Sequence, residues 1–209
     1  MRLTLPKIYP ITDRQLSGLS HAEQAQRLIE GGATFIQLRE KHLSPLDFFR
    51  DAEAAAKVAN NNRVTLIIND RVDIAMAIGA GGAHIGQDDM PVAPARRLVR
   101  AGAVIGFSTH TQPQMERALR LPIDYVAFGP VFPTRTKQDH DPTVGLEQLR
   151  AVKDIAAELP LVAIGGITAA NVLAVLDAGA DSVAVISSVV GEPSQIAQNV
   201  RRMLELAGI

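Results

Sequence analysis

The strongest constraint on the fold is a regular alternation of short apolar runs with longer amphipathic stretches along the whole chain. The apolar runs, rich in strand-forming residues, lie at residues 8–12, 34–38, 66–69, 83–85, 104–108, 125–128, 161–164 and 182–186. Between them, apolar residues recur at the spacing of one helix face. Eight such strand–helix units in 209 residues predict a (β/α)8 barrel (TIM barrel), a single α/β domain over residues 1–209.

The stretches between the runs carry recognisable helix starts, stops and inner faces. Ser44 followed by Pro45 is typical of a helix N-terminus, and Thr168 is a candidate cap for a later helix. Glycines at residues 31, 32, 79, 102 and 179 fall where helices should end. Each helix should bury one stripe against the strands, and the expected stripes include Leu46, Phe49, Ala52 and Ala56, then Leu98 and Val99, then Met115, Ala118 and Leu119.

A doubly wound open sheet is the alternative arrangement of the same units. That fold concentrates its chemistry at one switch point between strands. Here polar residues follow nearly every predicted strand, which favours a ring of strand ends and therefore the barrel. No linker, low-complexity segment or block of charge in the sequence marks a second domain.

The composition excludes several classes of function. The chain has no cysteine, which excludes disulfides and thiolate metal sites and fits a reducing compartment. Its formal net charge of −1 offers no basic field for nucleic acid or an anionic membrane. No apolar run has the length of a signal peptide or of a bilayer span. We therefore expect a soluble cytoplasmic protein with no nucleic-acid or membrane partner.

Carboxylates follow two neighbouring predicted strands. Asp70 comes directly after the run that ends at Asn69, and Asp88 and Asp89 follow the run that ends at Ile85. An isolated buried charge is very costly, so such groups must be paired, solvated or bound to a cation. One interpretation is a hard metal such as Mg²⁺, held by the carboxylates and by substrate phosphate oxygens. The other is that Asp70 and Asp89 cap the following helices, and these residues alone leave both open.

Basic residues and glycines add to the predicted ring of strand ends. Arg39 and Lys41 follow the second strand, and Lys137 follows the sixth, so several cations could meet a highly charged ligand such as a diphosphate. Gly165-Gly166, after the seventh strand, would let the backbone approach a phosphate, or would form only a tight turn. The long segment 129–145 is predicted to be either an active-site lid or a disordered surface segment.

Two histidines and one lysine are weaker candidates for covalent or acid–base chemistry. His84 lies inside a predicted strand, which favours a packing role. His110 lies at a strand end, but no serine or cysteine at a motif spacing supports a catalytic triad. Lys137 lies in a loop outside the sixth apolar run, a position that disfavours a Schiff base. These residues therefore do not support nucleophilic catalysis.

Seven short motifs, spread over nearly the whole chain, are specific in their joint order. They are QLREK at 37–41, INDR at 68–71, HIGQDD at 84–89, GFSTHT at 106–111, GPVFPTRTK at 129–137, AIGGI at 163–167 and AVISSV at 184–189. In this order they resemble the thiamine phosphate synthase family. The resemblance implies a (β/α)8-barrel transferase that joins hydroxymethylpyrimidine diphosphate to hydroxyethylthiazole phosphate, releases pyrophosphate and depends on Mg²⁺.

The resemblance also implies roles for individual residues. The pyrimidine diphosphate would be held by Gln37, Arg39, Lys41, Asn69, Ser108 and Lys137. Mg²⁺ would be bound by Asp70 and Asp89. The thiazole phosphate would be held by Thr134, Thr136, Gly166, Ile186 and Ser187. The catalytic residues, as electrostatic stabilisers and not as nucleophile or base, would be Arg39, Lys41, Asp70 and Lys137.

One departure and two rival functions accompany the resemblance. The family usually has an acidic and a larger apolar residue where this chain has Ala80-Gly81-Gly82-Ala83, so we expect a locally loosened fourth strand. The rivals are a thiazole tautomerase-like isomerase on the same barrel and a non-catalytic barrel that binds phosphate ligands. Asp70 and Asp89 disfavour the isomerase, which differs where the metal carboxylates belong. A homodimer is a further hypothesis, for which the low aromatic content offers no interface patch.

Overall fold

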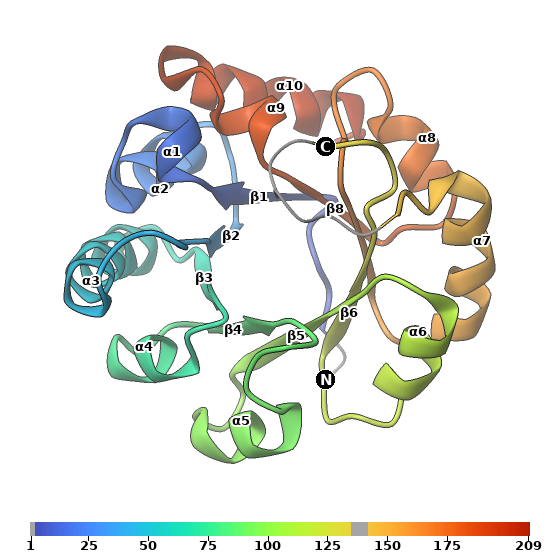
Figure 1. Cartoon of the computed structure of the whole chain (residues 1–209). Helices are drawn as coiled ribbons and strands as arrows, with labels where there is room; N and C mark the ends of the chain where they lie inside the picture. Colours follow the sequence, from blue (N-terminus) through green and yellow to red (C-terminus); the bar gives the residue numbers. More distant parts are fainter. Residues whose placement is uncertain (1–2, 135–141) are drawn as a thin grey trace.

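The computed structural model describes residues 3–134 and 142–209 of the chain. Its centre is a closed barrel of parallel strands that follow one another in chain order (Figure 1). The strands are β1 (Ile8–Thr12), β2 (Phe35–Leu38), β3 (Thr65–Asn69), β4 (Gly82–Ile85), β5 (Val104–Thr109), β6 (Tyr125–Phe128), β7 (Leu161–Ile164) and β8 (Ser182–Val185). The predicted single-domain (β/α)8 barrel is confirmed, and each predicted strand agrees with an observed one to within one residue at either end.

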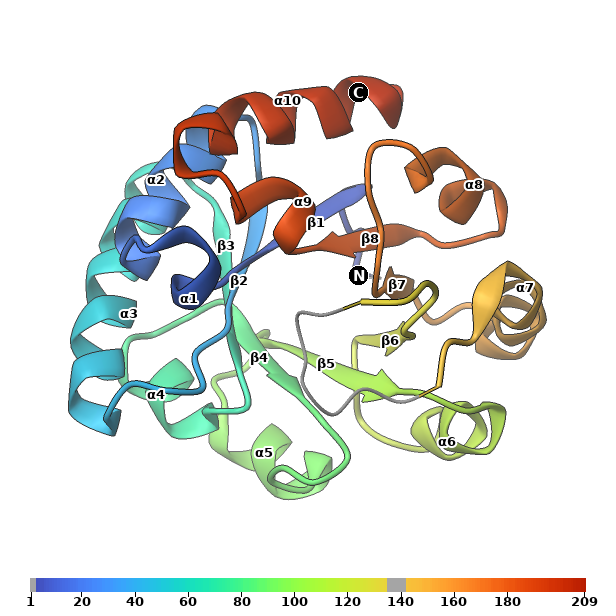
Figure 2. The same cartoon turned by 45° about the horizontal axis from the view of Figure 1, so that its top comes forward.

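Helices surround the outer face of this barrel (Figures 1 and 2). They are α1 (Arg14–Ser17), α2 (His21–Glu30), α3 (Pro45–Asn61), α4 (Val72–Ala77), α5 (Val92–Leu98), α6 (Gln112–Ala118), α7 (Gly145–Ala156), α8 (Val172–Asp177), α9 (Ser187–Val190) and α10 (Ile196–Leu206), with a 3-10 turn η1 at Pro193–Gln195. The last helix, α10, packs against α2 and so brings the two ends of the ring together. Within the described ranges, no helix combines the length and the apolar character that crossing a bilayer requires.

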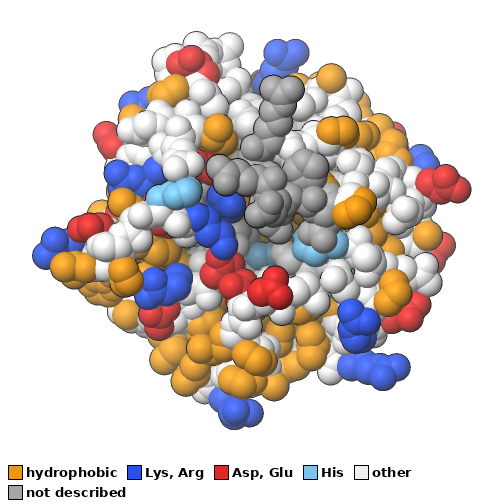
Figure 3. All heavy atoms as spheres, viewed as in Figure 1, with side chains coloured by type: hydrophobic (Ala, Val, Ile, Leu, Met, Phe, Trp, Pro, Cys, Tyr) orange, Lys and Arg blue, Asp and Glu red, His pale blue; other side chains and the backbone are white. Residues whose placement is uncertain are grey.

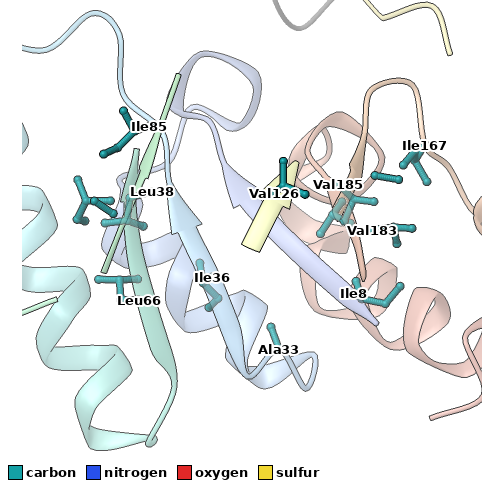
Figure 4. Packing of buried hydrophobic residues seen from close by; sticks show 14 of the residues in the cluster. Ile8, Ala33, Ile36, Leu38, Leu66, Ile85, Val126, Ile167, Val183 and Val185 are labelled. Atoms are coloured by element: carbon teal, nitrogen blue, oxygen red, sulfur yellow. The ribbon is translucent and has the colours of Figure 1, made fainter. Parts of the chain in front are cut away.

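The barrel wall divides the core into an inner and an outer part. Successive strand residues face opposite sides of the wall. Tyr9, Ile11 and Ile67 fill the interior, whereas Ile8 and Ile36 pack between the wall and the helices, as Figure 4 shows. Burying one such aliphatic side chain contributes roughly 1.5–3 kcal/mol. The outer layer therefore holds the helices in place, and the inner layer closes the barrel below its mouth.

Two glycines at the start of β4 have a packing reason. A Cβ on Gly82 would lie 1.9 Å from the carbonyl oxygen of Val104 on β5, and one on Gly81 would lie 2.7 Å from Thr65. β4 also pairs in regular parallel register with both β3 and β5. The expectation of a locally loosened fourth strand was therefore wrong, because Gly81-Gly82 allows close strand packing.

The inner face of α3 differs from the predicted one. Phe48 is 2% exposed and packs in the core, whereas Leu46 is 56% exposed. Phe49 is only partly buried. The buried stripe continues through Ala52 and Ala56, so its spacing places Phe48 one turn before Ala52. The prediction for Leu46 was wrong because this residue is two positions before Phe48, about 200° away around the helix axis, and so lies on the opposite face. The helix start was right, since the Ser44 side chain accepts a hydrogen bond from the Asp47 N–H.

Three further predictions about helix ends were wrong. Leu98 and Leu119 are 47% and 40% exposed. α5 and α6 are each 7 residues long, which is about two turns and leaves room for two inward positions. Thr168 does not cap α8, because Asn171 is the residue at its N-cap. Thr168 instead donates its N–H to the Asn171 side chain, in a turn before the helix.

Candidate active site

A cavity of about 530 Å³ opens at the end of the barrel where the strands finish. Every predicted site residue that the structure describes lines it, namely Gln37, Arg39, Lys41, Asn69, Asp70, Asp89, Ser108, Thr134, Gly166, Ile186 and Ser187. Two other predicted residues, Thr136 and Lys137, lie outside the described residues. Figure 3 shows basic and acidic side chains meeting near the centre of the mouth face. The fold therefore brings residues from distant parts of the sequence into one charged hollow.

Two carboxylates meet on one side of this cavity. Asp89 accepts a hydrogen bond of 2.7 Å from the Gly86 N–H. Burial, together with the hydrogen bond and negative charge of Asp70, raises the pKa of Asp89. The Lys41 ammonium forms an ion pair with Asp70. Asp88 also lines the cavity but is exposed, whereas Asp89 is partly buried and interacts directly with Asp70.

Neither carboxylate caps the helix that follows it. The N-cap of α4 is Arg71 and that of α5 is Pro91, and neither helix has a side-chain cap. The backbone of Asp70 adopts the left-handed conformation, with φ of 61°, which aspartate tolerates better than most residues. The capping interpretation is therefore wrong, and the two side chains remain available to a ligand in the cavity.

Residues at the end of β2 and directly after it alternate between the cavity and the helical layer. Gln37, Arg39 and Lys41 line the cavity. Arg39 also donates a hydrogen bond of 3.3 Å to Asp13. Glu40, between the two cations, points the other way and reaches the first residue of α2. The side chains thus continue to alternate in direction beyond the end of the strand, as they do within it. Alternate polar residues therefore face the cavity or the surrounding helices.

Glu40 anchors the segment that carries Lys41. One carboxylate oxygen accepts the N–H groups of residues 41, 42 and 43 at 2.8, 2.6 and 3.1 Å. The other oxygen lies 3.2 Å from Nε2 of His21, and the two side chains are 5% and 0% exposed. Burial opposes ionisation of Glu40, but these backbone N–H groups and His21 outweigh it and lower the pKa of the carboxyl. The charged form of Glu40 therefore fixes the path of the chain at Lys41.

The opposite side of the cavity, at β7 and β8, is built from backbone. Gly165 and Gly166 have φ values of 100° and 64°. A Cβ would lie 2.4 Å from Pro130 at Gly165 and 2.6 Å from the Pro133 oxygen at Gly166. Only glycine fits both the conformation and the space. Within the described ranges, no Lys or Arg from β7 or β8 lines this side.

The deep wall of the cavity contains three residues that were not predicted to be part of the site. Tyr9, Tyr125 and His84 line the cavity and are buried. Tyr9 and Tyr125 are the 2 tyrosines of the chain. A tyrosine inside an apolar strand usually has a partner for its hydroxyl, so this pair was a signal of a buried polar group. His84 was predicted to pack, and it does so while also contacting Tyr125 and Ser108 through both ring nitrogens.

The comparisons with known proteins agree on one family. Residues 8–189 match the family model described as thiamine monophosphate synthase. A curated relative from Chloroflexus aurantiacus, named thiamine-phosphate synthase, is 45% identical over 185 residues, which are 88% of this chain and 85% of that protein. A relative of the same name from Koribacter versatilis is 42% identical over 209 residues, 97% of each chain.

A solved structure adds the same relationship in three dimensions. The thiamine phosphate pyrophosphorylase from Pyrococcus furiosus aligns with a TM-score of 0.86 and 32% sequence identity. The alignment covers 97% of this chain and 95% of that one. The similarity therefore extends over the whole barrel and includes the segments that build the cavity.

Proposed function

Because the chain belongs to the thiamine monophosphate synthase family, and is thus a transferase of thiamine biosynthesis, we propose how its cavity carries out the reaction. Hydroxymethylpyrimidine diphosphate and hydroxyethylthiazole phosphate are joined to give thiamine phosphate and pyrophosphate. The observation that carries the proposal is the pairing, within one cavity, of a charged end at β2–β4 and a backbone end at β7–β8. Each end suits one of the two phosphorylated substrates.

The pyrimidine diphosphate occupies the charged end. Arg39 and Lys41 supply positive charge, and both already form ion pairs with carboxylates that a ligand can replace or share. Gln37, Asn69 and Ser108 supply uncharged hydrogen-bonding groups beside them. Lys137, which lies outside the described residues, completes the set by its place in the GPVFPTRTK motif.

The thiazole phosphate occupies the backbone end. Gly166, Ile186 and Ser187 line the cavity there, with Thr134 from the segment after β6, and Thr136 from outside the described residues is assigned to the same phosphate. Loops after strands seven and eight commonly hold phosphate in barrels of this kind. Backbone N–H groups suit a monophosphate because they bind it without competing for the cations of the other end.

The two carboxylates fit Mg²⁺. Asp70 and Asp89 can coordinate a metal only through oxygen atoms. Burial raises the pKa of Asp89, and repulsion from Asp70 raises it further. Within the described residues, no group of three or more His, Cys, Asp or Glu could hold a metal. The remaining ligands would be diphosphate oxygens and water, as Mg²⁺ prefers. When bound, Mg²⁺ neutralises charge on the pyrophosphate oxygens.

The chain's own residues act by charge and position. The bond between the pyrimidine methylene carbon and the diphosphate oxygen breaks, and the electron pair leaves with pyrophosphate. Arg39, Lys41 and Lys137 stabilise that developing negative charge, while Asp70 holds Lys41 in place. The thiazole nitrogen then donates its lone pair to the methylene cation. No proton has to be removed in either step, so the site requires no general base.

Measuring the products of the purified protein tests this function against its rivals. With both substrates and Mg²⁺, we expect thiamine phosphate and pyrophosphate in equal amounts. Rearrangement of the thiazole alone would support the isomerase, and binding without product would support the non-catalytic barrel. For the metal, Mg²⁺ with inorganic pyrophosphate should raise the melting temperature of the wild type but not of Asp89→Asn. An equal rise in both proteins would overturn the metal assignment.

We also propose that the protein is located in the cytoplasm and forms a homodimer. The absence of cysteine from the sequence supports the compartment. Sedimentation equilibrium tests the assembly, because the monomer mass is 22.4 kDa and a homodimer has twice that value. A monomer mass at micromolar concentration would contradict the dimer.

A further inference from the structure

Asp13 does not line the cavity, yet it contacts a residue that does. It follows the last residue of β1, and Figure 1 shows α1 and α2 beside β1 and β2. Its carboxylate accepts a hydrogen bond of 3.3 Å from Nη1 of Arg39, which lines the charged end of the cavity. The two side chains are 11% and 20% exposed. Arg39 thus faces the cavity while it is bonded to a largely buried carboxylate outside the cavity.

The position of Asp13 is fixed by hydrogen bonds that do not involve Arg39. The Asp13 N–H donates to the Gln24 side chain at 2.9 Å. Its carbonyl oxygen accepts the N–H and the hydroxyl of Ser17 at 3.2 and 3.0 Å. One carboxylate oxygen, Oδ1, caps α1 by accepting the Leu16 N–H at 3.1 Å. The other oxygen, Oδ2, is therefore held in one place, and this is the atom that Arg39 reaches.

The bond to Asp13 leaves most of the Arg39 guanidinium available to a ligand. A guanidinium has five N–H donors in one plane, arranged as a fork that matches phosphate oxygens. In the part of the chain that the structure describes, Asp13 is the one group that accepts a hydrogen bond from Arg39, and it uses Nη1. A diphosphate in the cavity can therefore bind Nε and Nη2 without displacing Asp13.

A similar pair of contacts occurs at Asp124, where no ligand group is involved. The Asp124 carboxylate accepts the Ile105 N–H at 2.7 Å and Nη2 of Arg96 at 2.5 Å. Neither Asp124 nor Arg96 lines the cavity. Both aspartates thus join a backbone N–H to an arginine, but only the arginine bound by Asp13 faces the substrates. Asp124 therefore serves as the control for a purely structural role.

We propose that Asp13 is a positioning residue, which holds the Arg39 guanidinium so that its remaining donors meet the diphosphate. A long side chain that a ligand has to immobilise contributes less to binding than one that is already in place. Asp13 holds Arg39 in place before the ligand arrives, and it lies outside the cavity, where it does not compete with the ligand for space. This inference rests on the proposed function, which assigns Arg39 to the pyrimidine diphosphate.

Titrating the purified protein with inorganic pyrophosphate and Mg²⁺ in a calorimeter tests the inference without the coupling reaction. In Asp13→Asn, the amide oxygen still caps α1, so the NH2 group faces Arg39 and cannot accept its hydrogen bond. We expect the dissociation constant of pyrophosphate to rise by about tenfold. In an Arg39→Ala background, Asp13→Asn should change it by less than about twofold, because Asp13 acts through Arg39. Asp124→Asn should bind pyrophosphate as the wild type does.

Kinetics and a second variant complete the test. In Asp13→Asn, kcat/KM for the pyrimidine diphosphate should fall by about tenfold, while the KM for the thiazole phosphate stays unchanged. If Asp13→Asn fails to fold, Asp13→Ser decides, because serine also caps a helix but is too short to reach Arg39. Unchanged or tighter pyrophosphate binding would overturn the inference, and so would an equal loss with and without Arg39. Absence of coupling activity in the wild type would instead refute the proposed function, and the pyrophosphate titration would still decide the role of Asp13.

Discussion

The two ends of the cavity offer binding groups of different kinds. At β2–β4, charged side chains gather in contact with one another, as the Lys41–Asp70 and Arg39–Asp13 ion pairs show. At β7–β8, the described lining residues are uncharged, and Gly166 brings the backbone close to the segment after β6. The strength with which a charged side chain binds a ligand depends on the charges around it. The position of a backbone N–H group, in contrast, depends only on the path of the chain. Substitutions should therefore affect the two ends in different ways.

The largest effect is expected from neutralising Asp70 at the charged end. Asp70→Asn should lower kcat by at least about 100-fold, because the carboxylate orients Lys41 and contributes to the proposed Mg²⁺ site. Asparagine is preferred to alanine here because the φ of 61° would cost alanine roughly 1–2 kcal/mol. Steady-state kinetics with Mg²⁺ measures the effect.

The control for Asp70 is Asp73→Asn. Asp73 is exposed and pairs with Arg71 on the outside of the barrel, so its loss should change kcat by less than about twofold. The free energy of unfolding of both variants, measured by thermal unfolding, should stay within about 1 kcal/mol of the wild-type value. Near-normal turnover of Asp70→Asn with Mg²⁺ would show that this carboxylate is not part of the catalytic machinery.

At the backbone end, the corresponding substitution is Gly166→Ala. The added Cβ would lie 2.6 Å from the Pro133 oxygen and 2.7 Å from Phe132, so the backbone has to move. We expect the KM for the thiazole phosphate to rise by about 10- to 100-fold. The KM for the pyrimidine diphosphate should stay unchanged.

Gly79→Ala is a closely matched control for backbone strain. Gly79 has the same φ of 64°, but a Cβ there meets nothing within 4 Å. Both variants should lose about 1–2 kcal/mol of stability from the left-handed conformation, measured by urea unfolding. Only Gly166→Ala should lose affinity for the thiazole phosphate. Equal kinetic defects in the two variants would mean that strain, and not the phosphate end, is responsible.

An intermediate effect is expected at Glu40, which positions the segment that carries Lys41. Substitutions of Glu40 therefore change the position of the Lys41 charge without removing that charge. Glu40→Ala should raise the KM for the pyrimidine diphosphate by about tenfold, because the segment carrying Lys41 loses its anchor. Glu40→Gln keeps one oxygen for the three N–H groups and should recover most of the affinity. Glu53→Ala on the exposed side of α3 is the control. If Glu40→Ala binds the diphosphate normally, the anchor has no role in binding.

The lowered pKa of Glu40 also predicts a pH dependence of stability. Its stabilisation is fully present above the ordinary pKa of 4.5 and is lost as the pH falls through the lower value in the folded protein. The free energy of unfolding of Glu40→Gln should therefore fall below that of the wild type at pH 7 and approach it below pH 4.5. A constant difference across this range would contradict the assignment.

The smallest effect is expected at Asp88, beside the charged end. Asp88 is exposed, whereas Asp89 is partly buried and bonds the Gly86 N–H. Asp88→Ala should change kcat by less than about twofold, while Asp89→Ala should abolish the response to Mg²⁺. Titrating activity against Mg²⁺ in both variants decides. Loss of the response in Asp88→Ala alone would reverse the assignment of the ligand.

Much of the site could be predicted because strand ends in a barrel meet at one mouth. The apolar runs gave the strands to within one residue, and the polar residues after them then had to lie together. Asp70 and Asp89 could not be distinguished from helix caps in this way. That choice needed the observed N-caps at Arg71 and Pro91, which depend on where each loop turns into its helix.

The sequence by itself determined the barrel, the order of its strands and the set of residues at its mouth, because period and strand ends are local properties. Only the tertiary structure decided what Glu40 and His84 contact. Glu40 meets His21 through the packing of α2 beside β2, and His84 meets Tyr125 across the space above Gly106. These partners are 19 and 41 residues apart in the chain. No local pattern encodes such contacts, because they exist only when the barrel closes.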